Sequence, residues 1–311
     1  MAQVILENLP LEERLEYIKE QQRRREEKTI VPNEKVRYRC EQLNITKIDD
    51  IPRSHSTQKK QYILEFNPSR NFVHVQLEEY FPTINPTVLK AIFEFVKLTE
   101  FVRNNVKFEL NDSGKIEKVT NRQEIHNNWD NLKKSSDFET EFIKKLRANH
   151  PKTVDKIIEI GDKQFSLTAN QEEEYRRDLF YFVLFDNYTG MVTDTENKEE
   201  FLFRSVLFPE VIIPLEMDGV LKKTDDPNLF IYRKKGKPIL TENIINIIKE
   251  KYNKIHKADV MYDFTEYYVN FDLNLEWDSI SKLPVKANLQ IQEGVRNNIE
   301  NICEYKLRKL S

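Results

Sequence analysis

The last part of the chain alternates between apolar and polar residues over an unusual length. In YYVNFDLNLEW, positions 267, 269, 271, 273, 275 and 277 are apolar or aromatic, and polar residues such as Asn270 and Asp272 separate most of them. The stretches PVKANLQIQ and ENICEYKLRKL repeat this alternation. A period of two residues is typical of a strand with one buried face. The pattern therefore predicts three long strands of an antiparallel meander whose other face contacts water.

Shorter alternating runs occur before residue 80, in KVRYRC, QYILEF and FVHVQL, and each of them predicts a strand. The stretch 136–190 is rich in helical patterns, and regular strand–helix–strand units are absent from the chain. Their absence argues against a parallel sheet. We therefore predict an α+β fold in which long antiparallel sheets, from β-rich N- and C-terminal regions, pack against helices, with a mostly helical middle.

The same patterns divide the chain into four segments. We expect an N-terminal helical arm (1–30), a β-rich lobe with two helices (31–135), a mostly helical connector (136–204) and a second β-rich lobe that ends in the meander (205–311). Residues 31–311 are compatible with one structural unit, and the two β-rich regions with one sheet or two. Within the second lobe we expect a hairpin turn at Asp218-Gly219, a further turn in RKKGKP and a helix capped by Thr241. The loop we expect before this lobe covers residues 189–200.

The stretch NDSGKIEKVTNRQEIHNNW, residues 111–129, gathers the side-chain types that catalysis uses. Each of them also has a structural explanation. The sequence from Asn111 to Gly114 is typical of a hairpin turn, and Asn121 with Glu124 has the spacing of a helix capping box. Trp129 falls on the apolar face of the following helix, with His126 beside that face. We therefore interpret the stretch as scaffold.

Motifs that carry known chemistry are absent from the sequence. None of the five His residues is four positions from another, and there is no C-x-x-C, no G-x-S-x-G and no phosphate-binding G-x-x-x-x-G-K-[ST]. The chain has only six Gly, and Cys40 and Cys303 each lie on the apolar side of a predicted strand. We therefore predict no catalytic residue, no metal ligand and no cofactor, and two buried, reduced thiols.

Charge and hydropathy restrict the partners and the location. The 49 basic and 52 acidic residues are mixed along the chain and give a net charge of −3, which does not favour nucleic-acid binding. The N-terminus lacks the pattern of a signal peptide, and the most apolar stretch, 87–102, is too short and too charged to span a membrane. With two Cys, these features indicate a cytoplasmic protein.

Three features suggest contact with a partner protein. The helical arm is charged on every side beyond Ile18, and a basic segment, 222–237, contains interleaved aromatic residues. The polar face of the predicted meander carries Asn270, Asp272, Asn274, Asn288, Gln290 and Gln292. The residues that we predict as partner contacts are Arg23, Arg24, Arg25, Tyr232, Arg233, Lys234 and Lys235. The oligomeric state does not follow from the sequence.

The segment VKFELNDSGKIEKVTNRQEIHNNWDNLKK resembles a segment of uncharacterised Bacteroidetes proteins. The shared pattern is a hydrophobic strand, Asp-x-Gly, I-x-x-V/I-x-N, E-I, Trp and Lys. The aromatic run LFYFVLF and the long C-terminal strands are also similar. The resemblance implies a common lineage and an α+β architecture, and it implies no activity.

Taken together, the sequence favours a non-enzymatic, protein-binding protein, such as an adaptor, a chaperone or an immunity-type partner. Two alternatives remain open at this point. One is a hydrolase whose site is assembled from dispersed carboxylates and His residues, and the other is a structural subunit of a larger assembly.

Overall fold

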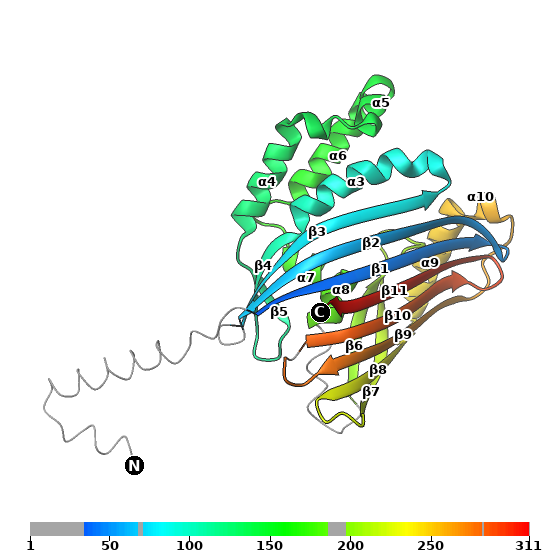
Figure 1. Cartoon of the computed structure of the whole chain (residues 1–311). Helices are drawn as coiled ribbons and strands as arrows, with labels where there is room; N and C mark the ends of the chain where they lie inside the picture. The colour runs from blue at the N-terminus through cyan, green and yellow to red at the C-terminus, as the bar shows by residue number, and fades with distance from the viewer. Residues whose placement is uncertain (1–33, 68–70, 186–196, 282, 311) are drawn as a thin grey trace, which may run out of the picture.

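The two β-rich regions of the sequence join in one sheet. The computed structural model describes residues 34–67, 71–185, 197–281 and 283–310. Within these ranges, eleven strands form one antiparallel sheet in the order β5-β4-β3-β2-β1-β11-β10-β9-β8-β7-β6 (Figure 1). The predicted α+β class with a helical middle is confirmed. The predicted arm, with Arg23, Arg24 and Arg25, lies outside the described residues.

The strands and helices have the following bounds. The strands are β1 (Glu34–Ile48), β2 (Ile51–Asn67), β3 (Phe72–Asn85), β4 (Asn105–Leu110), β5 (Ile116–Val119), β6 (Asn197–Arg204), β7 (Ile212–Lys223), β8 (Leu229–Pro238), β9 (Tyr267–Asp278), β10 (Leu283–Val295) and β11 (Ile299–Leu310). The α-helices are α3 (Lys90–Arg103), α4 (Arg122–Lys134), α5 (Glu141–Asn149), α6 (Pro151–Gln164), α7 (Gln171–Arg177), α8 (Leu179–Phe185), α9 (Glu242–Ile255) and α10 (Lys257–Val260). Two 3₁₀ turns, η1 (Thr87–Leu89) and η2 (Ser136–Phe138), precede α3 and α5.

The centre of the sheet is the pair formed by β1 and β11. Their register runs from Arg37 opposite Leu310 to Ile48 opposite Ile299. The predicted lobes 31–135 and 205–311 therefore share one continuous sheet. Figure 1 shows that this sheet is strongly curved.

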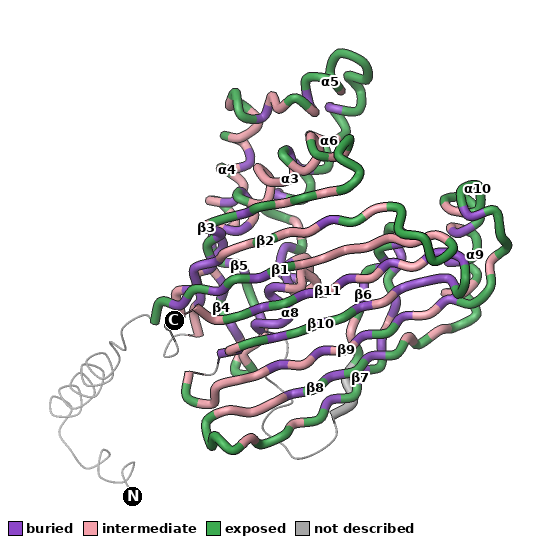
Figure 2. Tube along the Cα trace, turned by 45° about the vertical axis from the view of Figure 1, so that its right-hand side comes forward, coloured by how far each residue is buried: buried purple, intermediate pink, exposed green. Residues whose placement is uncertain are grey.

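The alternation at the end of the chain becomes the meander β9–β10–β11, as predicted. Leu273 on β9 lies opposite Leu289 on β10, which in turn lies opposite Tyr305 on β11, and all three side chains are buried. In Figure 2 the strands alternate between buried and more exposed residues. We call the face with these buried side chains the inner face, and the opposite face the outer face.

Helix α8 fills the space inside the curved sheet. Six of its seven residues, from Phe180 to Phe185, are buried. Phe180 stacks on Tyr62 of β2 with a centroid distance of 3.8 Å, and Phe182 lies 5.8 Å from Phe271 of β9. Helix α8 is apolar on all sides because neighbouring elements cover it on all sides. This burial accounts for the aromatic run LFYFVLF in the sequence.

The remaining helices lie in two groups. Helix α3 packs on β3 and contacts α4 and α5, while α6 contacts α4 and α5 (Figure 1). Trp129 of α4 lies among the rings of Phe138 and Phe165. Helix α9 begins as predicted, because the hydroxyl of Thr241 accepts a hydrogen bond from Ile244 N at 3.3 Å.

Two predicted turns are wrong. The chain runs straight through Asp218-Gly219 in β7 and through Gly236 in β8, and the hairpin turn lies between these strands. A Cβ at Gly219 would lie 2.8 Å from Cζ of Tyr232, and a Cβ at Gly236 would lie 2.5 Å from the sulfur of Met217. These glycines give room to large neighbours on the inner face, and they do not form turns. Residues 197–200 of the predicted loop belong to β6.

Residues of the stretch 111–129 make hydrogen bonds within the fold. Asn111 Oδ1 accepts hydrogen bonds from Ser113 N and Lys115 N, both at 3.0 Å, and Gly114 has φ 77°, which confirms the turn. The prediction of a capping box is wrong. Asn121 precedes α4, but its side chain makes no cap hydrogen bond. Its amide instead binds β4, as it accepts from Lys107 N at 2.9 Å and donates to the Asn105 carbonyl at 3.0 Å.

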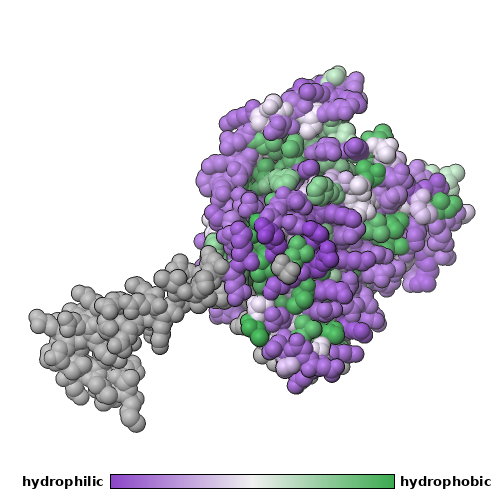
Figure 3. Space-filling model, viewed as in Figure 1, coloured by the Kyte–Doolittle hydropathy of each residue, from purple (hydrophilic) through white to green (hydrophobic). Residues whose placement is uncertain are grey.

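Hydrophilic residues cover most of the face seen in Figure 3, with hydrophobic patches among them. Within the part of the chain that the structure describes, no helix is both long enough and apolar enough to cross a bilayer.

Candidate functional site

Helix α7 bridges the two edge strands of the sheet. On one side, Glu172 Oε1 accepts a hydrogen bond from Val119 N of β5 at 2.8 Å, and Arg176 donates to a carbonyl of the same strand at 3.1 Å. On the other side, Glu174 pairs with Arg204 of β6 at 2.7 Å. Side chains of α7 therefore satisfy backbone groups at the β5 edge and connect that edge to β6. Asp178 forms the joint between α7 and α8.

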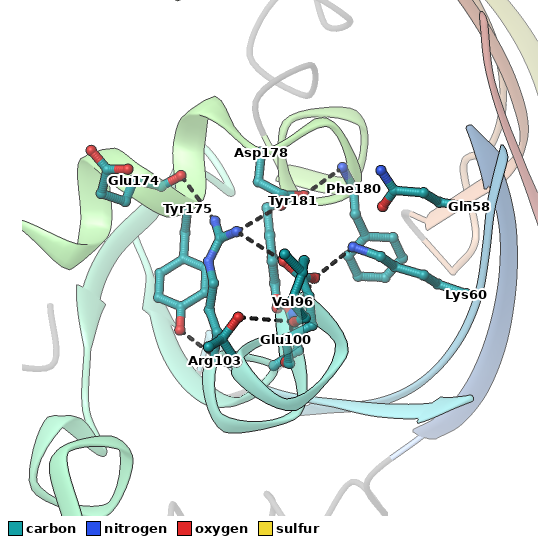
Figure 4. Close-up of polar contacts among 12 residues, drawn as sticks. Gln58, Lys60, Val96, Glu100, Arg103, Glu174, Tyr175, Asp178, Phe180 and Tyr181 are labelled. Atoms are coloured by element: carbon teal, nitrogen blue, oxygen red, sulfur yellow. Dashed lines mark hydrogen bonds and ion pairs between the residues drawn. The ribbon is translucent and has the colours of Figure 1, made fainter. Parts of the chain in front are cut away.

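A network of four charged residues lies at that joint (Figure 4). Lys60 of β2 contacts Glu100 of α3 at 2.5 Å, and Arg103 of α3 contacts Asp178 at 3.1 Å. The side chains are between 13% and 18% exposed. Two cations and two carboxylates balance, as expected for charges that are largely removed from water.

Neutral groups fix the geometry of this network. Asn104 donates to Glu100 Oε2 at 3.0 Å, and its own Oδ1 accepts from the Tyr181 hydroxyl at 2.6 Å. Phe180 N donates to Asp178 Oδ1 at 3.0 Å. Residues on α3, α7 and α8 are thus connected by hydrogen bonds, so the network locks these helices together.

The pKa shifts in the network do not favour acid–base chemistry. Burial disfavours the charge on Lys60, but the carboxylates of Glu100 and Asp178 outweigh it and hold the pKa of Lys60 above its ordinary value. Burial likewise disfavours the Glu100 carboxylate, but Lys60 and Arg103 hold the pKa of Glu100 below its ordinary value. General acid–base catalysis needs a pKa near the working pH. The pKa of Lys60 and the pKa of Glu100 are both moved away from neutral pH.

The two thiols are buried on the inner face, as predicted. Burial raises the pKa of Cys40, and also that of Cys303, to about 12. The thiolate is the reactive form of cysteine, so these shifts make both residues poor nucleophiles at neutral pH.

A cavity of about 270 Å³ lies beside the network. It is bounded by β1, β6, β10, β11 and the α7–α8 joint. Its lining residues are Gln42, Asn44, Arg103, Glu174, Arg177, Asp178, Leu179, Phe201, Leu202, Phe203, Arg204, Val206, Ile291, Glu293, Asn301 and Cys303. The inner face of β1 changes character there: Tyr38 and Cys40 are followed by Gln42 and Asn44 at the next inward positions. We call this space the inner cavity.

Glu293 of β10 forms part of the cavity wall and is almost completely buried, at 1% exposure. It accepts hydrogen bonds from the hydroxyls of Ser205 and Tyr267, and from Val206 N at 2.7 Å and Leu207 N at 3.3 Å. Burial raises the pKa of its carboxyl, although these donors oppose the shift. Glu293 therefore anchors the segment that follows β6 to the central part of the sheet.

Potential metal ligands do not cluster in the described ranges. No group of three or more His, Cys, Asp or Glu residues there has an arrangement suitable for a metal ion. His126, which the sequence places beside the apolar face of α4, lies with its Nδ1 3.2 Å from the Phe165 carbonyl and its Nε2 3.7 Å from Asp130. These contacts agree with the scaffold interpretation.

The partner contacts predicted on β8 lie on two different faces. Arg233 and Lys235 are exposed on the outer face. Tyr232 and Lys234 are each 3% exposed, so their side chains are not available to a surface partner. The basic run resembles one continuous surface in the sequence, but the strand period places consecutive side chains on opposite faces.

The six polar residues of the meander form an ordered array on the outer face. The register pairs Asn270 with Gln292, Asp272 with Gln290 and Asn274 with Asn288. All six side chains are half-buried or exposed. We call these six residues, five with amide side chains and one with a carboxylate, the amide patch.

The row that contains Asn270 and Gln292 extends across two further strands. Gln292 lies opposite Ile302 of β11, which lies opposite Ile45 of β1, and both isoleucines are half-buried. Four uncharged side chains from four strands therefore stand in line. Charged residues border the array, among them Lys286 and Glu276, which contact each other at 3.6 Å.

The residues of the charged network were missed in the sequence analysis. Lys60 stands at an inward position of β2, two residues before the buried Tyr62, and Glu100 and Arg103 lie three positions apart on α3. A lysine at an inward strand position indicates a buried charge that needs a counter-ion. The sequence does not show that its partners come from α3 and the α7–α8 joint. Their meeting depends on the tertiary fold.

No protein-family model matches this chain, and no curated protein matches it. The resemblance to Bacteroidetes proteins stays a prediction.

Proposed function

We propose that this protein is a non-enzymatic binding protein that holds a partner protein against the outer face of its sheet. The observation that carries the proposal is the row of four uncharged side chains formed by Ile45, Ile302, Gln292 and Asn270, next to the other four residues of the amide patch. The inner face of the same strands is occupied by α8 and its aromatic neighbours. The outer face is left to solvent over the described strands β1, β11, β10 and β9.

The chemistry of the array suits a polar but largely uncharged partner surface. Asn and Gln offer both donors and acceptors, so they adapt to backbone and side-chain groups of a partner. Charged residues are depleted at the centre of protein interfaces and tolerated at their rim. The outer face follows this arrangement, since the row from Ile45 to Asn270 is uncharged and the charged residues Asp272 and Glu304 stand in the next row.

The test combines charge insertion with a matched control. Gln290→Arg with Asn274→Arg places two cations in the array at solvent-accessible positions, so the fold is retained. Thr83→Arg inserts a cation on the exposed face of β3, outside the array. Tagged wild type and both variants are expressed in the native host, and co-purifying proteins are quantified by mass spectrometry.

We expect a stoichiometric partner with the wild type and with Thr83→Arg, and its loss with the double variant. The complex is then reconstituted from purified components and its mass measured by light scattering. Recovery of the same partner in equal amount with the double variant contradicts the proposal. A wild-type protein that recovers no stoichiometric partner also contradicts it.

A further inference from the structure

Four basic side chains stand together on the outer face of the central strands. The register places Lys286 of β10 opposite Arg308 of β11, and Arg308 opposite Arg39 of β1. Lys306 lies two positions from Arg308 and therefore on the same face of β11. All four residues are exposed. We call these four residues the cation cluster.

Most of the cation cluster has no counter-ion in the part of the chain that the structure describes. Lys286 contacts the carboxylate of Glu276 at 3.6 Å. Arg39 donates a hydrogen bond to the uncharged amide of Gln61 at 2.8 Å. The two members on β11 form no ion pair and no side-chain hydrogen bond among the described residues.

The carboxylate that faces the cluster in the register is already in contact with another lysine. Glu41 of β1 lies opposite Lys306, but it contacts Lys59 of β2 at 3.4 Å. The row formed by Lys286, Arg308 and Arg39 therefore places three cations side by side with one carboxylate at its end.

The fold does not need this arrangement. Like charges directly opposite each other on neighbouring strands are destabilising. Basic side chains on an edge strand can prevent aggregation, but β10, β11 and β1 are interior strands of the sheet. Carboxylates supplied by another molecule would remove the repulsion, so the cluster indicates an acidic partner.

The spacing of the row restricts the shape of that partner. Neighbouring strands lie about 4.8 Å apart, so the row from Lys286 through Arg308 to Arg39 spans about 10 Å. On a helix, side chains at i, i+4 and i+7 share one face and also span about 10 Å. On an extended chain, three successive side chains of one face span about 13 Å. An acidic stripe on a helix therefore fits the row better than an acidic strand.

Charge and position favour a protein over a nucleic acid. The chain has a net charge of −3, so its overall field does not attract a polyanion. Lys306 lies opposite Asn288, so the cation cluster is continuous with the amide patch. We propose that the cation cluster binds an acidic stripe on a helix of the partner protein, with carboxylates at i, i+4 and i+7. This inference rests on the proposed function, because it gives the chemistry of that partner beside the amide patch.

The first test uses the purified full chain and the fluorescence anisotropy of labelled synthetic peptides. The stripe peptide is an alanine-based helix of about 18 residues with Glu at i, i+4 and i+7. The scattered peptide has the same composition with Glu at i, i+2 and i+5, which fall on different faces. The broken peptide keeps the stripe spacing and has Pro between the Glu residues, which prevents a helix. We expect the stripe peptide to bind at least about fivefold more tightly than either control, and more weakly as salt rises from about 20 to about 300 mM.

Two variants locate the site. Arg39→Gln/Arg308→Gln removes two cations from exposed positions and should weaken binding of the stripe peptide at least about fivefold. Lys235→Gln is the matched control on the same face, because Lys235 has its own counter-ion, Asp272, at 3.7 Å. It should change binding by less than about twofold. The double variant should melt at or above the temperature of the wild type, because it removes like charges that face each other.

The inference is overturned if the stripe peptide does not bind the wild type at low salt, or binds no better than the scattered or the broken peptide. Undiminished binding by Arg39→Gln/Arg308→Gln, or a lower melting temperature of that variant, contradicts it as well. Tighter binding of a DNA duplex of about 20 base pairs than of the stripe peptide would make a nucleic acid the occupant and would equally contradict it.

The variant Asn274→Arg/Gln290→Arg separates this inference from the proposed function. It leaves the cation cluster intact, so it should bind the stripe peptide no more weakly than the wild type, although it is expected to lose the cellular partner. Loss of the cellular partner by this variant, together with full recovery by Arg39→Gln/Arg308→Gln, would leave the proposed function standing and overturn the acidic helix. Loss of the partner by both variants, with the expected order of the peptides, supports the inference.

Discussion

Lys60 Nζ lies 2.5 Å from Glu100 Oε2, and the two side chains are 13% and 15% exposed. Removing one member of such a pair leaves a buried charge without its counter-ion, which costs about 3–5 kcal/mol. We expect Lys60→Met to lower the free energy of unfolding by about 3 kcal/mol or more. The double variant Lys60→Met/Glu100→Leu should recover part of this loss, because the remaining pair, Arg103 and Asp178, is still balanced.

Urea denaturation of the two single variants and the double variant measures the coupling between these residues. Strictly additive effects would show that the pair is not coupled.

Glu100 should also make stability depend on pH. Burial opposes its ionisation, but Lys60 and Arg103 outweigh this and hold the folded-state pKa of Glu100 below the ordinary value of 4.5. A carboxyl with a lowered pKa stabilises the fold above its unfolded pKa, and this contribution is lost as the pH falls through the folded pKa. The stability difference between wild type and Glu100→Gln should therefore be largest near neutral pH and shrink below about pH 4.5. A difference that stays constant or grows on acidification contradicts this prediction.

Gly161→Ala should destabilise the protein even though Gly161 lies in helix α6. Alanine is the better helix former by about 1 kcal/mol. A Cβ at this position, however, would lie 2.7 Å from Cη2 and 2.8 Å from Cε2 of Trp129. Overpacking typically costs about 1–3 kcal/mol, which exceeds the gain in helix propensity. We therefore expect the melting temperature to fall. Ile160→Ala, at a neighbouring side chain that is 64% exposed, is the control and should change the melting temperature little. An increase for Gly161→Ala would mean that Trp129 moves aside freely.

Asn121→Ala should cost more than the loss of a helix cap. Its side chain binds Lys107 N at 2.9 Å and the Asn105 carbonyl at 3.0 Å, and it is 9% exposed. Leaving such groups without partners costs about 1–3 kcal/mol. Thr140→Ala provides the comparison, because the Thr140 hydroxyl caps α5 through Ile143 N and its loss should cost about 1 kcal/mol. Equal losses for the two variants in chemical denaturation would argue against the bond to β4.

Cys40 and Cys303 should react slowly with thiol reagents in the native protein. Both are buried, and burial raises the pKa of each thiol to about 12. The expected result is slow labelling by a maleimide in buffer and fast labelling in denaturant. Thr168→Cys adds a thiol at an exposed position and should label rapidly without denaturant. Native labelling of Cys40 or Cys303 at the rate of this added thiol would contradict the prediction.

The sequence patterns predict the features that depend only on residues close together in the chain, such as strand faces and turns. The alternation around Leu273 and Leu289 depends on which face each residue occupies, and the turn at Asn111 depends on its own backbone. Gly219 looks like a turn because glycine tolerates positive φ, but it lies in a strand because the Tyr232 ring occupies the space beside it. Such a contact between neighbouring strands has no local pattern.

The site depends on which strands become neighbours, and the alternation does not specify that. Asn44 and Cys303 each stand at an inward position of their strand. Nothing in the two strand sequences indicates that they lie opposite each other. The charged network is a stronger example, because Lys60 meets Glu100 only after β2 and α3 have been placed around α8. Prediction of the inner cavity would need the β1–β11 pairing first.

That pairing has a consequence for synthesis on the ribosome. Arg37 of β1 is translated early, and its partner Leu310 is translated near the end of the described chain. Until residues 299–310 emerge, one side of β1 presents unpaired backbone groups, which can pair with another nascent chain. Contacts so distant in sequence also form slowly. Production of this protein should therefore respond strongly to translation rate and to the supply of holdase chaperones, more than its folded stability alone would indicate.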